Sequence, residues 1–127
     1  MRVEKHGFGE LAESLESAGR DIEKPVAKVT GRALLNMKRD AQARVSGHPH
    51  LRQLPRSYTY DVQIQRGRVI GEVGAEHRRP QGTLDHLIED GSPTSPPIPH
   101  WAPAADREVP VWQRYLDDVA AEVLDAR

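Results

Sequence analysis

The chain contains no cysteine and few aromatic residues, and both features limit the structures and chemistry that are open to it. Without cysteine it can form no disulfide, no thiolate metal site and no cysteine nucleophile. Aromatic residues make up only 5% of the 127 residues, so the hydrophobic core must be small, and contacts between subunits would help to stabilise it. The length fits one domain, which we expect to span residues 1–127.

Long apolar runs and net charge are also lacking. No segment approaches the roughly 18 apolar residues needed to span a bilayer, and the first residues, MRVEKHGFGELAE, lack the apolar core of a secretory signal. We therefore expect a protein that is soluble and intracellular when made. The net charge of −1 argues against bulk binding of nucleic acid, although it says nothing about local patches.

The charge that is present is unevenly distributed. Residues 24–56 carry eight basic side chains against the single acid Asp40, whereas the segments before and after them are acidic overall. A chain with basic and acidic faces can stack on copies of itself or on neighbours through charge complementarity. A solvated helix face that happens to be basic explains the same pattern, and both readings stay open. We assign four residues to the basic face: Lys28, Arg32, Lys38 and Arg39.

Three helices are predicted from apolar residues that recur every three or four positions. A short one covers residues 8–18 and ends at Gly19. A long one covers residues 22–45, with Pro25 in its first turn. The third begins at about Pro110. Its apolar stripe is formed by Trp112, Tyr115, Leu116, Val119 and Val123.

Between the two longer helices the apolar pattern changes from helical spacing to strict alternation. Residues 57–65 predict a half-buried strand, and residues 68–76 return beside it after a tight turn at Arg66 and Gly67. The inward face carries Tyr58, Tyr60, Val62 and Ile64 on the first strand and Val69, Val73 and Ala75 on the second. These elements predict an α+β fold in which helices pack on one face of a small antiparallel sheet, with a long central helix, a β-hairpin and a C-terminal helix. The edges of so small a sheet must be covered or paired with another chain.

Histidines and acidic residues suggest metal binding and catalysis, but simpler explanations compete with both. The His-Pro-His of residues 48–50 is a loop sequence without the ligand spacing of a zinc site, so solvated histidines explain it. Asp85 and His86 with Glu89 and Asp90 could form an acid–base cluster, yet no nucleophile elbow or phosphate-binding glycine loop accompanies them. An acidic turn that caps a helix and stays in water explains the same residues. We therefore expect no metal, no cofactor and no enzymatic activity.

Four arginines outside the long helix could contact a phosphate backbone. They are Arg52, Arg56, Arg78 and Arg79. Aromatic side chains interleave poorly with them, because Tyr58 and Tyr60 belong to the predicted inward face of a strand. A sequence-specific reader of nucleic acid is therefore not expected, while non-specific proximity to DNA stays open.

Residues 91–103 contain five prolines, which predicts an extended loop without regular structure. Trp101 lies in this loop, where it either packs over the core of its own domain or forms an anchor at a subunit interface. We assign six residues to a candidate assembly interface: Glu89, Gly91, Pro97, Pro99, Trp101 and Pro103.

Taken in order, these elements resemble the neck or tail-completion proteins of long-tailed phages, a family of head–tail connectors whose type member comes from a lambdoid coliphage. In that family a hydrophobic pair, Glu, an aromatic residue, Gly and Thr precede a proline-led segment and a C-terminal helix. The matching residues are LIEDGS at 87–92 and PPIPHWAPA at 96–104. Asp90 replaces the aromatic residue and Ser92 the Thr, and SGHPHL at residues 46–51 replaces the family's Ala-Pro-x-x-Thr-Gly-x-Leu step.

The resemblance implies a virion protein, made in the host cytoplasm, that forms a ring in the neck around the DNA exit channel. The implied partners are copies of itself in a hexamer, a head-completion (stopper) protein, a tail-terminator or tail-tube protein, and viral DNA that passes without sequence-specific contact. No membrane partner is expected. The rival hypothesis is a small intracellular nucleic-acid-binding or toxin-like module. It would use Arg32, Lys38, Arg39 and Arg44 on phosphates.

Overall fold

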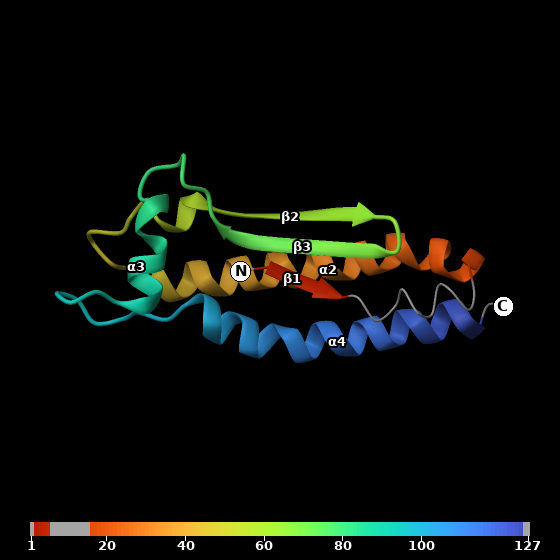
Figure 1. The fold of residues 1–127 in the computed structure, drawn as a ribbon. Coiled ribbons are helices and arrows are strands. Elements are labelled where there is room, and N and C mark those ends of the chain that lie inside the picture. The colour runs from red at the N-terminus through yellow and green to blue at the C-terminus, as the bar shows by residue number, and fades with distance from the viewer. Residues whose placement is uncertain (1, 6–15, 126–127) are drawn as a thin grey trace.

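The structure, a computed structural model, describes residues 2–5 and 16–125. Its three described strands form an antiparallel sheet in the order β1-β3-β2, and the long helices α2 and α4 pack against one face of it (Figure 1). The predicted α+β fold is confirmed, with its long helix, hairpin and C-terminal helix. The elements are β1 (Arg2–Lys5), α2 (Glu16–Val45), η1 (Pro55–Ser57), β2 (Tyr58–Gln65), β3 (Arg68–Ala75), η2 (Gly82–Leu84), α3 (Asp85–Asp90) and α4 (Trp101–Asp125).

Glycines shape the hairpin of β2 and β3 at two points. Gly67 has φ 73° in the tight turn between the strands, a conformation that side chains disfavour. Gly71, in the middle of β3, faces α2: a Cβ there would lie 2.7 Å from Leu34 Cδ1 and 2.8 Å from Thr30 Cγ2. The absence of a side chain at Gly71 therefore lets α2 approach the sheet closely.

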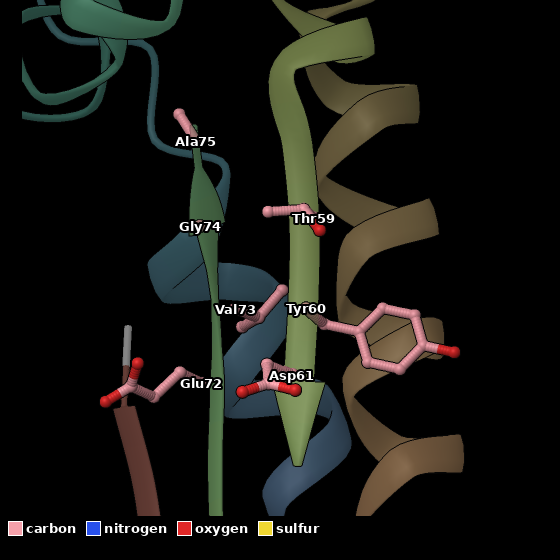
Figure 2. A pocket seen from close by; sticks show the side chains of 7 residues that line it. All are labelled: Thr59, Tyr60, Asp61, Glu72, Val73, Gly74 and Ala75. Carbon is pink, nitrogen blue, oxygen red and sulfur yellow. The ribbon is translucent and has the colours of Figure 1, made fainter. Parts of the chain in front are cut away.

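The predicted inward face of β2 is less buried than expected. Tyr58 is buried as predicted, but Tyr60 is 38% exposed and Ile64 is 48% exposed. The reason is that β2 lies at an edge of the described sheet, where α2 covers only part of the strand. Figure 2 shows Tyr60 pointing toward α2, and the ammonium of Lys38 lies 6.0 Å from the centre of its ring.

Helix α2 begins earlier than predicted. It runs through Gly19, which we expected to end a preceding helix, and through Pro25, which we expected in its first turn. Both expectations are wrong, because Ile22 is almost fully buried against α4 and this packing stabilises the helix on both sides of the proline. Most of the helix predicted for residues 8–18 lies outside the described residues, and residues 16–18 belong to α2.

Helix α4 also begins earlier than predicted, at Trp101 instead of about Pro110, which lies inside the helix. Residues 101–103 are therefore helical and do not belong to the proline-rich loop. The first turn of α4 is capped by the side chain of Glu89 from α3. A sequence pattern based on apolar spacing along α4 alone could not reveal this cap.

The core consists of two clusters of buried side chains, one toward each end of the long helices. The cluster near α3 includes Met37, Tyr58 and Trp101, and the cluster at the other end includes Val26 and Trp112. In the second cluster the indole N–H of Trp112 donates to Thr30 Oγ1 at 3.0 Å, which ties α4 to α2 with a buried hydrogen bond.

Candidate functional site at the start of α4

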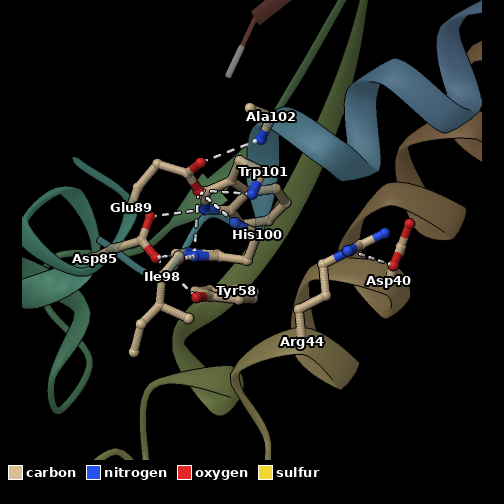
Figure 3. Close-up of polar contacts among 9 residues, drawn as sticks. All are labelled: Asp40, Arg44, Tyr58, Asp85, Glu89, Ile98, His100, Trp101 and Ala102. Carbon is tan, nitrogen blue, oxygen red and sulfur yellow. Dashed lines mark hydrogen bonds and ion pairs between the residues drawn. The ribbon is translucent and has the colours of Figure 1, made fainter. Parts of the chain in front are cut away.

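The carboxylate of Glu89, near the end of α3, caps the N-terminus of α4 (Figure 3). Its Oε1 accepts the backbone N–H of His100 at 3.0 Å and that of Trp101 at 2.6 Å, and its Oε2 accepts the N–H of Ala102 at 3.3 Å. Pro103 has no N–H, and Ala104 donates to the carbonyl of His100, which closes the first helical turn. One side chain therefore satisfies the free N–H groups at this helix end and places a negative charge at its positive pole.

His100, the residue before α4, is fully buried, and both of its ring nitrogens face oxygens. Nε2 lies 2.7 Å from Asp85 Oδ1, while Nδ1 lies 2.8 Å from the carbonyl oxygen of Ile98 and 3.2 Å from Glu89 Oε1. Burial alone would lower the pKa of His100, but its hydrogen bonds to Asp85 and Ile98 and the two nearby carboxylates raise this pKa above its ordinary value of 6.5. The arrangement therefore suits an imidazolium that donates from both nitrogens.

Asp85, the first residue of α3, accepts hydrogen bonds from three side chains. The hydroxyl of Tyr58 reaches Oδ1 at 2.8 Å, as His100 Nε2 does at 2.7 Å, and the indole N–H of Trp101 reaches Oδ2 at 2.8 Å. Burial would raise the pKa of Asp85, but these bonds and the charge of His100 hold it below its ordinary value of 3.8. One carboxylate thereby joins β2, α3 and the start of α4.

Tyr58 completes the cluster from the side of the sheet. Its ring stacks on that of His100, with ring centres 5.8 Å apart and planes at 5°, and its centre lies 4.6 Å from that of Trp101. Burial raises the pKa of Tyr58, and so do its hydrogen bond to Asp85 and the charges of Asp85 and Glu89, so its hydroxyl remains a donor. We call these five residues, Tyr58, Asp85, Glu89, His100 and Trp101, the His100 cluster.

The His100 cluster contains groups that transfer protons in many active sites, but here they bond to one another. The side chain of His100 has no exposed surface, and those of Asp85 and Glu89 are only 13% and 16% exposed. Because each ring nitrogen already lies within hydrogen-bond distance of an oxygen of the protein, neither is free to meet an outside substrate. The geometry is suited to holding α3, β2 and α4 in fixed positions.

The acid–base cluster that we considered from the sequence differs from the cluster in the structure. We considered Asp85 with His86 and Glu89 with Asp90, but His86 and Asp90 are exposed and take no part in the His100 cluster. The predicted helix-capping role is confirmed for Glu89, whereas the expectation that these acids stay in water is wrong for Asp85 and Glu89. The signal that could have found the cluster is the spacing of four residues, which puts both carboxylates on one face of a helix.

Trp101 belongs to the core of its own domain. Its side chain is 6% exposed, and its indole is held by Asp85 and packed on Tyr58. The interpretation of Trp101 as an exposed interface anchor is therefore wrong, and the alternative, packing over its own core, is what the structure shows. Pro103, which we also assigned to the interface, is half-buried in the first turn of α4.

Gly91 opens a proline-rich loop that projects beyond the start of α4 (Figure 1). Gly91 has φ 81°, and a Cβ there would lie 2.8 Å from the nitrogen of Pro97, so only glycine fits without strain. The N–H of Ile98 donates to the carbonyl of Ile88 at 2.7 Å, which holds the returning end of the loop against α3. Four prolines of the loop are exposed: Pro93, Pro96, Pro97 and Pro99.

The residues of the predicted basic face do not share one surface. Lys28 and Arg32 line a groove between α2 and α4, and Arg39 is exposed, but Lys38 is half-buried beside Tyr60 at the edge of the sheet.

The four arginines that we considered for phosphate contact are all exposed: Arg52, Arg56, Arg78 and Arg79. Arg79 donates from Nη1 to the carbonyl of Arg56 at 3.0 Å and pairs through Nε with Glu76 at 2.8 Å. Arg56 and Arg79, which are far apart in the sequence, therefore lie side by side. Arg44, which the rival hypothesis placed on phosphates, is paired with Asp40 at 2.9 Å.

A shallow hollow of about 360 Å³ lies on the hairpin, lined by residues 59–61 and 72–75 (Figure 2). Asp61 stands opposite Glu72 across the two strands. All of its lining comes from β2 and β3, so no groups from other elements converge there as they do in a binding site. Among the residues that the structure describes, no group of three histidine, aspartate or glutamate side chains is arranged to hold a metal ion.

Comparisons with family models, curated proteins and solved structures found no match for this chain. In the described part of the chain, no helix has both the length and the apolar character needed to cross a membrane.

Proposed function

We propose that this chain is a non-enzymatic structural protein of the phage neck, one subunit of a ring that joins the DNA-filled head to the tail around the DNA exit channel. Its partners are further copies of itself, a head-completion protein and a tail-terminator or tail-tube protein. The proposal rests mainly on residues 87–91, LIEDG, which have two structural roles. Glu89 caps α4, and Gly91 permits the close turn against Pro97.

The contacts of this segment explain the residue types on which the resemblance to neck proteins rests. A carboxylate at Glu89 reaches backbone N–H groups of another helix, and a glycine is required at the positive φ of Gly91. Together they brace an exposed loop whose prolines limit its flexibility. A stiff loop loses little conformational entropy on binding, which favours a docking role for residues 92–99.

The sheet offers a second place for contact with a neighbour. β2 pairs only with β3 in the described sheet, so one edge of β2 keeps unpaired backbone groups in the described part of the chain. Such an edge can pair with a strand of another chain. An assembly subunit completed by its neighbours would use both features.

The nucleic-acid-binding or toxin-like alternative is less well supported. Of its four phosphate-binding candidates, Arg44 is paired with Asp40, and Lys38 lies beside Tyr60 at the sheet edge. Arg32 and Arg39 remain exposed on another side of α2. A DNA titration at two salt concentrations separates the two hypotheses, because tight, salt-steep binding by a stable monomer would favour the alternative.

The proposal is tested by joining heads to tails in vitro. Heads and tails prepared without this protein should remain separate and should join after the purified protein is added, as counted by electron microscopy. The double variant P93G/P96G loosens the exposed loop and should lower the yield of joined particles. The matched control, P49G/P80G, changes two exposed prolines elsewhere and should leave the yield unchanged. If heads and tails join equally well without the protein, the proposed function is refuted.

A further inference from the structure

Two loops from distant parts of the sequence meet at the end of the molecule beside α3 (Figure 1). Residues 46–56 follow α2 and lead toward β2, and residues 76–83 follow β3 and lead toward α3. The side-chain amide of Gln81 joins them. Its Oε1 accepts the backbone N–H of Gln53 at 2.9 Å, and its Nε2 donates to the carbonyl oxygen of His50 at 2.7 Å. One side chain therefore clamps the two loops together.

The clamped loops are fixed in conformation. Gln81 has φ 65°, a left-handed conformation that residues other than glycine rarely adopt. Backbone strain of this kind persists only where the surrounding structure holds it, and it is commonest at binding and catalytic sites. Arg79 adds a third link, because its Nη1 donates to the carbonyl oxygen of Arg56 at 3.0 Å. The loops are therefore ordered before a ligand arrives, which lowers the entropy cost of binding.

The clamped loops are basic in a chain that is acidic overall. They contain four arginines and one acid, Glu76, which pairs with Arg79 at 2.8 Å. With neutral histidines the loops carry a charge of +3, and the net charge of −1 leaves −4 for the rest of the chain. The exposed His50 and His77 add to the positive charge when they are protonated. All four arginines are exposed, and we call them the arginine patch: Arg52, Arg56, Arg78 and Arg79.

The composition of the loops indicates which anion the arginine patch fits. A guanidinium group presents paired N–H donors that match the oxygens of a phosphate. Neither loop has an exposed large apolar side chain, whereas an interface with a protein partner usually has an apolar centre. Neither loop contains Phe, Tyr or Trp, on which the bases of a single strand would stack. The phosphates of a duplex, which lie exposed along its whole length, match this polar and positive surface best.

We propose that the arginine patch binds the phosphate backbone of double-stranded DNA without reading its sequence. The choice of DNA as the duplex rests on the proposed function, and the inference adds the surface through which a neck subunit meets the DNA. It differs from the nucleic-acid-binding alternative, which places phosphates on α2 and expects tight binding. The arginine patch should bind weakly, with a Kd of about 10⁻⁴ to 10⁻⁶ M, as is typical of sequence-independent contacts.

Fluorescence anisotropy with a short labelled DNA duplex tests the arginine patch. Between about 50 and 200 mM salt, a plot of log K against log salt should have a slope of about −3 to −4, because each phosphate contact releases roughly 0.9 counterions. R52Q/R78Q should reduce this slope to about −2 and weaken binding at about 50 mM salt by roughly tenfold or more. The side chains of Arg52 and Arg78 form no hydrogen bond or ion pair with another described residue, so this variant keeps the clamp.

The matched control is R32Q/R39Q, which removes two exposed arginines of α2 and changes the net charge equally. It should bind the duplex like the wild type, and circular dichroism checks that both variants are folded. A wild-type chain that does not bind the duplex, or an R52Q/R78Q variant that loses no more affinity than the control, would overturn the inference. Equally tight binding of a single strand of the same length would also overturn it, and so would equally tight binding of poly-glutamate, which stands for an acidic protein surface.

The joining of heads to tails separates this inference from the proposed function. If the wild type joins heads to tails but R52Q/R78Q binds the duplex like the wild type, the arginine patch is wrong and the neck function stands. If the two variants bind DNA as expected but the wild type never joins heads to tails, the arginine patch stands and the neck function is wrong.

Discussion

Replacement of Glu89 by alanine should be among the most damaging single changes to the described fold. It removes the acceptor for three backbone N–H groups at the start of α4 and one of the two carboxylates beside His100. Loss of a helix cap costs about 1 kcal/mol. Leaving buried, charge-assisted partners unsatisfied adds about 2 to 3 kcal/mol. We therefore expect the free energy of unfolding to fall by about 3 to 4 kcal/mol, a large part of the roughly 5 to 15 kcal/mol of a typical domain.

Urea unfolding followed by circular dichroism measures this difference, and two variants calibrate it. Asp90→Ala changes the adjacent acid, which is exposed, and should cost less than about 0.5 kcal/mol. Glu89→Gln keeps one oxygen for the N–H groups of His100 and Trp101 but loses the charge, so it should fall between the other two. If Glu89→Ala were as stable as Asp90→Ala, the capping of α4 by Glu89 would be refuted.

The remaining predictions concern pH and the loop. Because folding raises the pKa of His100, this residue contributes stability that is complete below pH 6.5 and is lost as the pH rises through its folded pKa. Because folding lowers the pKa of Asp85, this residue contributes stability that is present above pH 3.8 and is lost as the pH falls through its folded pKa. The midpoint of urea unfolding should therefore be highest between pH 3.8 and pH 6.5. In the His100→Gln variant this midpoint should fall less steeply as the pH rises above that range. An equally steep fall in the variant would contradict a stabilising role of the His100 imidazolium. Gly91→Ala places a Cβ at positive φ against Pro97 and should lower the free energy of unfolding by about 1 to 3 kcal/mol in the same assay, and a neutral effect would show that the turn differs in solution.

Regular elements were predictable where they depend on residues that are neighbours in the sequence. Alternating side chains and the turn at Gly67 predicted the hairpin, because a strand's pleat and a tight turn depend on neighbouring residues. Apolar residues at helical spacing predicted α2 and α4. The predicted stripe of α4 is right for Trp112 and Leu116, which are buried, but wrong for Tyr115, which is 58% exposed. The sequence also showed the segregation of basic and acidic residues along the chain.

The helix starts and the candidate site depended on contacts between distant residues. α4 begins at Trp101 because Glu89, eleven residues before His100, satisfies its free N–H groups, and α2 continues through Pro25 because Ile22 is buried against α4. Neither contact can be inferred from the spacing of apolar residues along one helix. The apolar spacing therefore placed these helices near their observed positions but gave late starts.

The amino-acid sequence alone predicted the α+β class, the hairpin, two long helices and an extended proline-rich loop after residue 91. The folded structure was needed to see that His100 and Trp101 face inward onto Asp85, and that Lys28 and Arg32 line a groove between α2 and α4. Backbone propensity and periodicity depend on residues that are close in the sequence. A buried ion pair, a cap from another helix and a charged surface depend on segments that only folding brings together.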